Sequence, residues 1–187
     1  MSSSYPGNIP KWLEGNKTFA TEVFPSLPQP WHMDQRRVLA KESGKTTLVL
    51  TCLDPRCVPE TFFGPEFDGP VFRNAGGRAT DDAIRSFTLL RGLAGLKNVA
   101  VIHHTDCGAM HATKKEIVDT VAPEGPEAKR AAEEIDYGLF SPDELEESIR
   151  DDVRLLRSAK PLAGVNVLGF KLDTFTGKIE PVEVETC

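Results

Sequence analysis

The chain has 187 residues, of which 40 % are hydrophobic and 27 % are charged, a composition typical of one soluble globular domain. Its net charge of −6 argues against a nucleic-acid-binding protein, because such proteins present a basic surface. No apolar run reaches the roughly 20 residues that span a bilayer, and the N-terminus lacks the basic and apolar segments of a signal peptide. We therefore expect a cytoplasmic protein whose four cysteines are free thiols or metal ligands.

Two helices are expected before the first strand, in residues 10–24 and 33–41. The first of them carries three aromatic side chains that can anchor it to another surface: Trp12, Phe19 and Phe24.

From residue 46 onward, strands and helices alternate. The helices are expected to begin at Thr80, an N-cap residue followed by two acids, and at Ser141, which forms a capping-box pattern with Glu144. The strands are apolar and β-branched, as in strands that are covered on both faces. The segments predicted to hold the strands and a closing hairpin are residues 46–52, 69–77, 98–104 and 164–185.

This order predicts an α/β fold with a mainly parallel β-sheet flanked by helices. We assign residues 46–187 to this domain and residues 1–45 to an N-terminal helical arm, which packs on a partner subunit or on the chain's own core. In open parallel sheets, ligands bind at the carboxyl ends of the strands. Cys52 ends one predicted strand and His104 ends another, so we expect these two side chains to be neighbours.

A metal site is predicted at this edge. His104 and Cys107 enclose two residues, and together with Cys52 they offer one imidazole and two thiolates, which suits zinc. Three protein ligands leave a fourth position for water or substrate, as in catalytic sites. Two alternatives stay open, because His103 can replace His104 and Cys57 can fill the fourth position and make the site structural. In a third, no metal binds.

The residues around these ligands resemble those of the β-class carbonic anhydrases. The resemblance rests on CLDPR (52–56), HTDC (104–107) and the intervening FRNAGGRATDDAIRSF (72–87), and it covers roughly residues 46–171. By this resemblance the zinc ligands are Cys52, His104 and Cys107.

The resemblance also implies an assembly and a reaction. Members of the β-class carbonic anhydrases exchange an N-terminal helical arm between protomers, so the resemblance implies a homodimer or a dimer of dimers. Their zinc hydroxide attacks CO₂ to give bicarbonate. Related members hydrolyse carbonyl sulfide or carbon disulfide, so hydrolysis of carbonyl sulfide to CO₂ and hydrogen sulfide is the enzymatic alternative. A non-catalytic, zinc-stabilised binding protein is the alternative from another class.

Asp54 and Arg56 account for the motif that begins at Cys52. Two thiolates cancel the charge of Zn²⁺, so this site acidifies water less than a three-histidine site. We expect Asp54 to accept a hydrogen bond from the zinc-bound hydroxide, and Arg56 to hold Asp54 in a bidentate pair. If Arg56 releases it, Asp54 can become a fourth zinc ligand, a closed form that the resemblance implies. The simpler interpretation is a solvated surface ion pair.

A narrow apolar pocket would suit a small linear substrate such as CO₂ or carbonyl sulfide. Three apolar residues are candidates to line it, although packing in the core is the simpler interpretation of each. Two glycines are expected to form a tight turn near the site. The candidate residues are Phe62, Phe63, Val71, Gly76 and Gly77.

Four further residues have ordinary interpretations beside functional ones. Asp106 and His111 suggest a proton shuttle, since histidine titrates near neutral pH, but a surface histidine without a role is the simpler interpretation. For Cys57 and Cys187 the simpler interpretation is a small hydrophobic residue.

Overall fold

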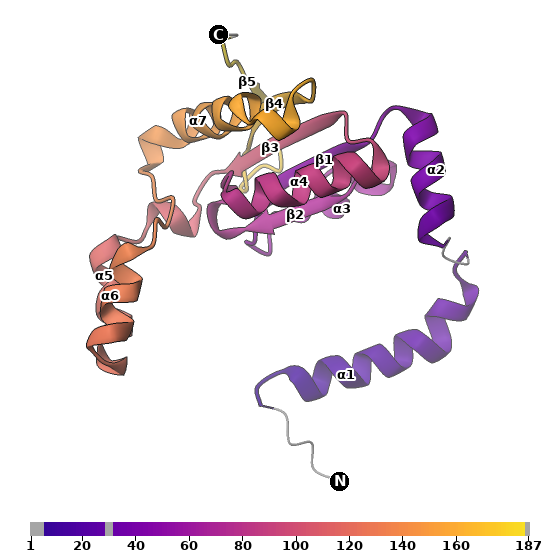
Figure 1. Ribbon diagram of the computed structural model, residues 1–187. Coiled ribbons are helices and arrows are strands. Elements are labelled where there is room, and N and C mark those ends of the chain that lie inside the picture. Colours follow the sequence, from indigo (N-terminus) through magenta and orange to yellow (C-terminus); the bar gives the residue numbers. More distant parts are fainter. Residues whose placement is uncertain (1–5, 29–31, 186–187) are drawn as a thin grey trace. The chain divides into compact units, whose positions relative to one another are not determined.

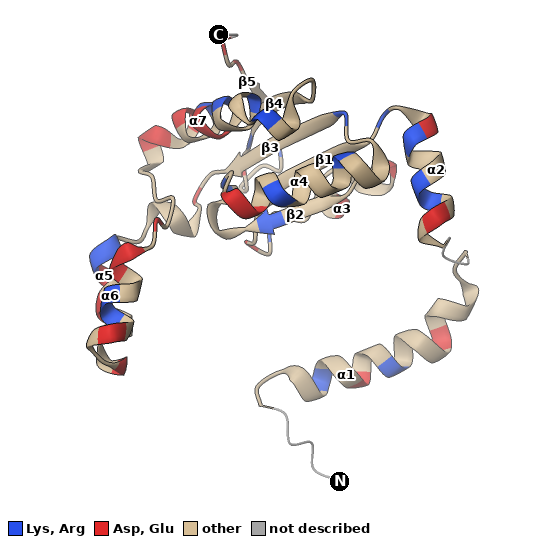
Figure 2. Ribbon diagram, in the orientation of Figure 1, with Lys and Arg blue, Asp and Glu red and all other residues tan. Residues whose placement is uncertain are grey.

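The computed structural model describes residues 6–28 and 32–185, so Cys187 lies outside the described residues. The chain divides into two compact units, Met1–Arg36 and Arg37–Cys187, and the α/β fold lies in the second. Charged side chains of both signs are spread over helices such as α4 and α7 (Figure 2). None of the described helices is long and apolar enough to cross a membrane.

Five strands form one sheet in the order β2-β1-β3-β4-β5 (Figure 1). The first four strands of this order are parallel, and β5 pairs antiparallel with β4 through the predicted hairpin at Thr176–Gly177. The mainly parallel α/β fold is therefore confirmed. The strands are β1 Thr47–Cys52, β2 Val71–Asn74, β3 Asn98–His104, β4 Asn166–Leu172 and β5 Ile179–Val182.

Both predicted helix starts are confirmed. Helix α4 (Asp81–Ala94) follows Thr80, whose Oγ1 accepts a hydrogen bond from the N–H of Ala83 at 3.3 Å. Helix α7 (Leu145–Ser158) follows a 3₁₀ turn, and the reciprocal bonds of Ser141 and Glu144 close that turn as a capping box.

Helices α4 and α7 cover the same face of the sheet (Figure 1). Phe72 packs edge-on against Phe87 of α4, with ring centroids 5.6 Å apart. A Cβ on Gly169 would lie 2.5 Å from Ile149 of α7, so only glycine allows this close approach. The strand register joins these two contacts in one row of residues on that face: Phe72, Leu50, Val101 and Gly169.

The opposite face is less covered within this unit. Its aromatic cover comes from Phe63 and Phe67, which follow the short helix α3 (Pro59–Phe62) and flank a hollow of about 290 Å³ with Val49 and Ala100. Leu168 on this face has 51 % of its surface exposed. Apolar surface of the sheet therefore remains accessible on this side.

A helical hairpin between β3 and α7 was not predicted. Helices α5 (Lys114–Val121) and α6 (Pro126–Glu134) pack on each other and project from the sheet (Figure 1). Thr113 and Glu116 form a capping box at the start of α5. This Thr-x-x-Glu pattern is a local signal that would have located the helix.

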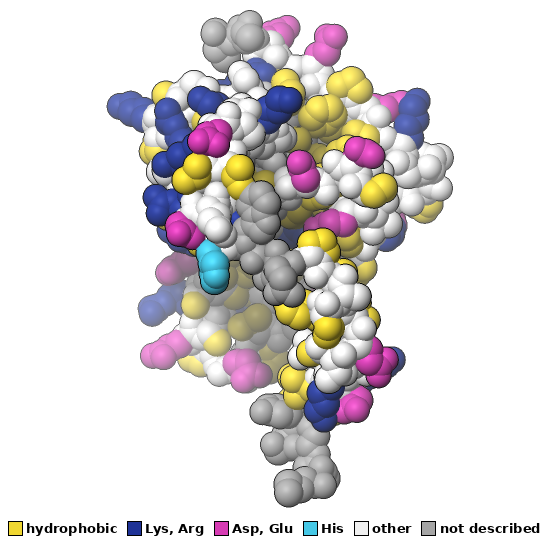
Figure 3. All heavy atoms as spheres, turned by 90° about the vertical axis from the view of Figure 1, so that its right-hand side faces the viewer, with side chains coloured by type: hydrophobic (Ala, Val, Ile, Leu, Met, Phe, Trp, Pro, Cys, Tyr) yellow, Lys and Arg dark blue, Asp and Glu magenta, His cyan; other side chains and the backbone are white. Residues whose placement is uncertain are grey.

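The first unit is helical, as predicted. Helix α1 (Ile9–Thr18) continues as a π-helical turn, Phe19–Val23, and then as a 3₁₀ turn that contains Pro25. Pro25 lacks the N–H that a continuing α-helix needs, so the helix ends at this turn. Trp12 is 66 % exposed, and hydrophobic side chains appear yellow on the molecular surface in Figure 3. The packing of the N-terminal arm on a partner subunit or on the chain's own core stays a prediction, as does the end of the arm at residue 45.

The second predicted N-terminal helix is α2 (Met33–Ser43), which crosses the boundary between the two units.

Candidate metal centre

The carboxyl ends of β1 and β3 bring three potential metal ligands together. Cys52 is the last residue of β1, His104 is the last residue of β3, and Cys107 lies in the loop that follows. One ligand atom from each lies within 4.8 Å of the other two, and the two sulfur atoms are 3.8 Å apart. All three side chains are buried. These residues can therefore hold a metal ion.

The imidazole of His104 is oriented for binding. Its Nδ1 lies 2.9 Å from the carbonyl oxygen of Thr105, which can only accept a hydrogen bond, so Nδ1 carries the proton. In the neutral ring Nε2 is then an acceptor; it is buried and has no hydrogen-bond partner among the described residues. A buried polar atom without a partner is costly. A metal ion bound by Nε2 would remove this cost, so the residues fit a metal.

The two thiols and the imidazole shift one another's pKa values. The hydrogen bond with the Cys107 thiol is the main cause that lowers the pKa of Cys52 to about 4, and burial acts in the opposite direction. The pKa of Cys107 is raised by the adjacent Cys52 and by burial. Burial acts to lower the pKa of His104, but the nearby Cys52 and Cys57 thiols outweigh it and raise it to about 10. A cation binding here would displace protons from these groups.

His103 belongs to a different set of contacts. Its Nδ1 lies 2.8 Å from Ser148 Oγ, and its Nε2 lies 3.2 Å from the carbonyl oxygen of Gly77 and 3.0 Å from Asp152 Oδ2. Asp152 is also 3.0 Å from Nε of Arg78. Both nitrogens of His103 therefore face protein groups, and this ring is not placed beside the two thiols.

Cys57 is buried but lies outside the three-residue group. Its N–H donates to the carbonyl oxygen of Asp54 at 2.8 Å, which closes the turn after Cys52. Within residues 6–28 and 32–185, Cys52, Cys57 and Cys107 are all free thiols.

Asp54 and Arg56 form the bidentate pair that the motif predicts. Nε of Arg56 donates to Oδ1 at 3.0 Å and Nη2 donates to Oδ2 at 2.8 Å. The Arg56 side chain is the main cause that lowers the pKa of Asp54 to about 2. Only 17 % of the Asp54 side chain is exposed, so this contact is partly shielded from solvent.

Arg73 on β2 holds the same turn and was not singled out from the sequence. Its Nε donates to the carbonyl oxygen of Cys52 at 2.9 Å and its Nη2 donates to that of Asp54 at 2.6 Å. The available signal was a cationic residue that directly follows the apolar residues Val71 and Phe72.

The predicted glycine turn lies against Cys52. Gly77 has a φ of +71°, and a Cβ there would come within 2.9 Å of the Cys52 nitrogen. Gly76 is also buried and has a φ of +75°. Phe62 and Val71 are half-buried, while Phe63 lies beside the hollow next to Val49. A substrate pocket formed by these five candidates stays a prediction.

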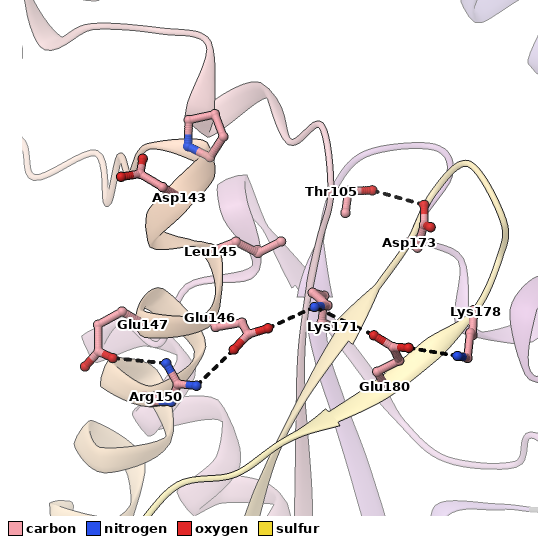
Figure 4. Close-up of a pocket in the computed structure, with 11 residues that line it drawn as sticks. Thr105, Asp143, Leu145, Glu146, Glu147, Arg150, Lys171, Asp173, Lys178 and Glu180 are labelled. Atoms are coloured by element: carbon pink, nitrogen blue, oxygen red, sulfur yellow. Dashed lines mark hydrogen bonds and ion pairs between the residues drawn. The ribbon is translucent and has the colours of Figure 1, made fainter.

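A larger hollow of about 650 Å³ has Thr105 as one of its lining residues (Figure 4). A chain of ion pairs crosses it, and none of the three candidate ligands lines it. Its basic side chains each pair with an acid, so it is a polar groove rather than an apolar substrate pocket. The chain runs through Glu147, Arg150, Glu146, Lys171, Glu180 and Lys178.

Comparisons with known proteins place the chain in a family. The family model for carbonic anhydrase matches residues 47–162, which is more than half of the chain. The chain belongs to the β-carbonic anhydrase family. A crystal structure of carbonic anhydrase from Streptococcus mutans has a TM-score of 0.75 at 25 % identity, covering 96 % of this chain and 99 % of that one.

Two curated relatives differ in their sequence identity to this chain and in the length over which they match it. Carbon disulfide hydrolase of Acidianus sp. (strain A1-3) is 43 % identical over 84 residues, which are 44 % of this chain and 41 % of that protein. The match therefore spans less than half of that relative's length. Beta-carbonic anhydrase 1 of Mycobacterium tuberculosis is 27 % identical over 179 residues, which are 91 % of this chain and 95 % of the relative.

Proposed function

We propose that this chain is a zinc-dependent β-carbonic anhydrase that converts CO₂ and water to bicarbonate. The observation that carries the proposal is the Nε2 of His104, which no described residue hydrogen-bonds and which lies beside the thiols of Cys52 and Cys107. One imidazole and two thiolates favour zinc among the common metals. Zinc bound there supplies Lewis acidity, which makes water nucleophilic near neutral pH.

Asp54 is the residue proposed to orient the nucleophile. Because Arg56 lowers its pKa to about 2, the carboxylate is ionised at neutral pH and acts only as an acceptor. Each Asp54 oxygen accepts from Arg56 and keeps further acceptor capacity for a water molecule. A water that donates to Asp54 would have its lone pair turned toward the substrate carbon. Arg56 acts by holding Asp54.

Hydrolysis of carbonyl sulfide or carbon disulfide is the second candidate function. The similarity to carbon disulfide hydrolase over 84 residues favours it. The same residues would serve both reactions, because each begins with attack of water on the carbon of a small linear molecule. The difference must then lie in the substrate pocket.

A paired assay on the zinc-loaded protein separates these functions. CO₂ hydration is followed by stopped flow, and sulfide release is measured from carbonyl sulfide and from carbon disulfide. Fast hydration with slight sulfide release supports the proposal, and the reverse moves the substrate to the sulfur compounds. Neither activity, with one zinc bound per chain, would leave a zinc-stabilised binding protein.

We also propose that the N-terminal arm mediates assembly into a homodimer or a dimer of dimers. Exposed aromatic side chains on this arm, Trp12 and Phe19 among them, support this proposal, since large apolar side chains on a surface often mark interfaces. Replacing Phe19 by Asp should shift the sedimentation coefficient toward that of a monomer. An unchanged coefficient in the Trp12→Asp and Phe19→Asp variants would exclude the arm.

A further inference from the structure

The loop between His104 and Cys107 contains an unusual backbone conformation. Asp106 has a φ of 54° and is the one non-glycine residue with positive φ in the part of the chain that the structure describes. This region is unfavourable for residues with a side chain, although Asp and Asn tolerate it best. Such a conformation persists only where surrounding contacts maintain it.

Three hydrogen bonds hold Asp106 in place. Its Oδ2 accepts from Nη1 of Arg56 at 2.9 Å, and its carbonyl oxygen accepts from Nη2 of the same arginine at 2.9 Å. Its Oδ1 lies 2.9 Å from Nε2 of His111. The left-handed backbone thus directs both the carboxylate and the carbonyl toward Arg56.

Arg56 thereby joins the loops that follow β1 and β3, the two strands that end in Cys52 and His104. It contacts Asp54 on its own loop through Nε and Nη2, and it contacts Asp106 on the other loop through Nη1 and Nη2. Asp54 and Arg56 alone belong to one loop and could move together. The contacts with Asp106 tie this pair to the loop of His104 and Cys107.

This tie matters because Asp54 is itself a potential metal ligand. Carboxylates bind zinc, and the Asp54 backbone N–H lies 3.4 Å from the Cys52 sulfur, so Asp54 is close to the site. A carboxylate that binds the metal occupies the open position where substrate or water must enter.

We propose that Asp106 is a positioning residue that fixes Arg56, and through it keeps Asp54 turned away from the metal. His111 supports Asp106 by holding its second oxygen. The inference rests on the proposed zinc function and adds to it the residue that keeps the fourth position open. It assigns Asp106 and His111 an orienting role, in place of a proton shuttle.

Two substitutions separate the charge of Asp106 from its geometry. Asp106→Asn keeps a side chain that tolerates the left-handed backbone but removes the negative charge. Asp106→Gly removes every side-chain contact without straining the backbone. Asp119→Asn is the matched control, because Asp119 is exposed and pairs with Lys115 on α5.

The open position is probed with thiocyanate on cobalt(II)-loaded protein, followed by visible absorption. Asp106→Gly should weaken thiocyanate binding about tenfold or more, the range typical of supporting residues at metal sites. CO₂ hydration by the zinc form should fall with it, Asp106→Asn should show a smaller effect, and Asp119→Asn none. Adding Asp54→Asn to Asp106→Gly should restore thiocyanate binding while hydration stays low, because the amide no longer competes for the metal.

Unchanged thiocyanate binding in Asp106→Gly would overturn the inference. So would a loss of hydration that imidazole buffer restores while thiocyanate binding stays normal, since this would identify a proton relay. If the wild-type protein hydrates no CO₂ but the thiocyanate pattern holds, the positioning role stands and the proposed reaction fails. If the wild-type protein hydrates CO₂ normally but the variants bind thiocyanate as the wild type does, the proposed reaction stands and the positioning role fails.

Discussion

His103 and His104 are adjacent in the chain, and both are completely buried, but they lie in different chemical surroundings. His103 points to the side of the sheet covered by α7, where Ser148 and Asp152 approach its ring. His104 points to the opposite side, where its Nε2 has no hydrogen-bond partner among the described residues. Burial therefore does not distinguish a structural histidine from a metal ligand, whereas the contacts of each nitrogen do.

The two surroundings also differ in what they contribute. Around His103, a carboxylate, a guanidinium and a hydroxyl lie close together inside the protein. Removing one member of such a buried group destabilises the fold, because it leaves a buried charge without its partner. Around His104, two thiols offer further ligand atoms within 4.8 Å of the ring nitrogen. Three pairs of substitutions test this difference, in order of expected effect.

The largest effect is expected on metal binding. His104→Ala should weaken zinc binding by more than about 100-fold, because removing a ligand costs more than removing a supporting contact. His103→Gln should leave zinc affinity within about tenfold of the wild type, since both nitrogens of that ring face protein groups other than the two thiols. Competition with a chromogenic chelator measures both values. Equal losses of zinc affinity in the two variants would indicate that His103 is also a metal ligand.

The next effect is expected on the free energy of unfolding. Asp152 is 2 % exposed, and Asp152→Ala would leave Arg78 and His103 without their carboxylate, at a cost of about 3–5 kcal/mol. Urea unfolding of the metal-free protein measures this change. The neighbouring Asp151 is exposed and pairs with Arg154, so Asp151→Ala should change the same free energy by at most about 0.5 kcal/mol. Similar values for both variants would mean that the buried group contributes little.

The smallest effect, again on the free energy of unfolding, is expected for Gly77, which lies between His103 and the backbone of Cys52. Its carbonyl oxygen lies near His103, and its Cα faces the backbone of Cys52. Gly77→Ala should destabilise the protein by about 1–3 kcal/mol more than Gly177→Ala, because the added Cβ is overpacked only at Gly77.

Gly177 is the matched control, since its φ is +72° and a Cβ there would meet no atom of the described residues within 4 Å. Its replacement by Ala should cost only the left-handed conformation, about 1–2 kcal/mol. Equal unfolding free energies for the two variants would show that the turn can move away from Cys52.

Much of the fold was predictable because the signals are local. Thr80 and the pair Ser141 and Glu144 marked the starts of helices, since capping depends on residues within one turn. The α5–α6 hairpin was missed although Thr113 and Glu116 carry the same signal. The site was predictable in its residue types, because thiols and imidazoles at the ends of parallel strands are compatible with few other roles.

The contacts that organise the site were less predictable. Arg56 was expected to bind Asp54, but its bonds to Asp106 join segments 50 residues apart. The bonds from Arg73 to the turn after Cys52 depend on the pairing of β1 with β2. No local pattern reports such contacts.

The sequence by itself determined the α/β order, the family motifs and the cysteines and histidines that can bind a metal, because these follow from periodicity and short spacings. It also determined that His103 and His104 face opposite sides, since side chains alternate along a strand. Only the tertiary structure decided which side is which. Helix α7 packs on the face of Val101 and brings Ser148 and Asp152 to His103, and this leaves His104 beside the two thiols.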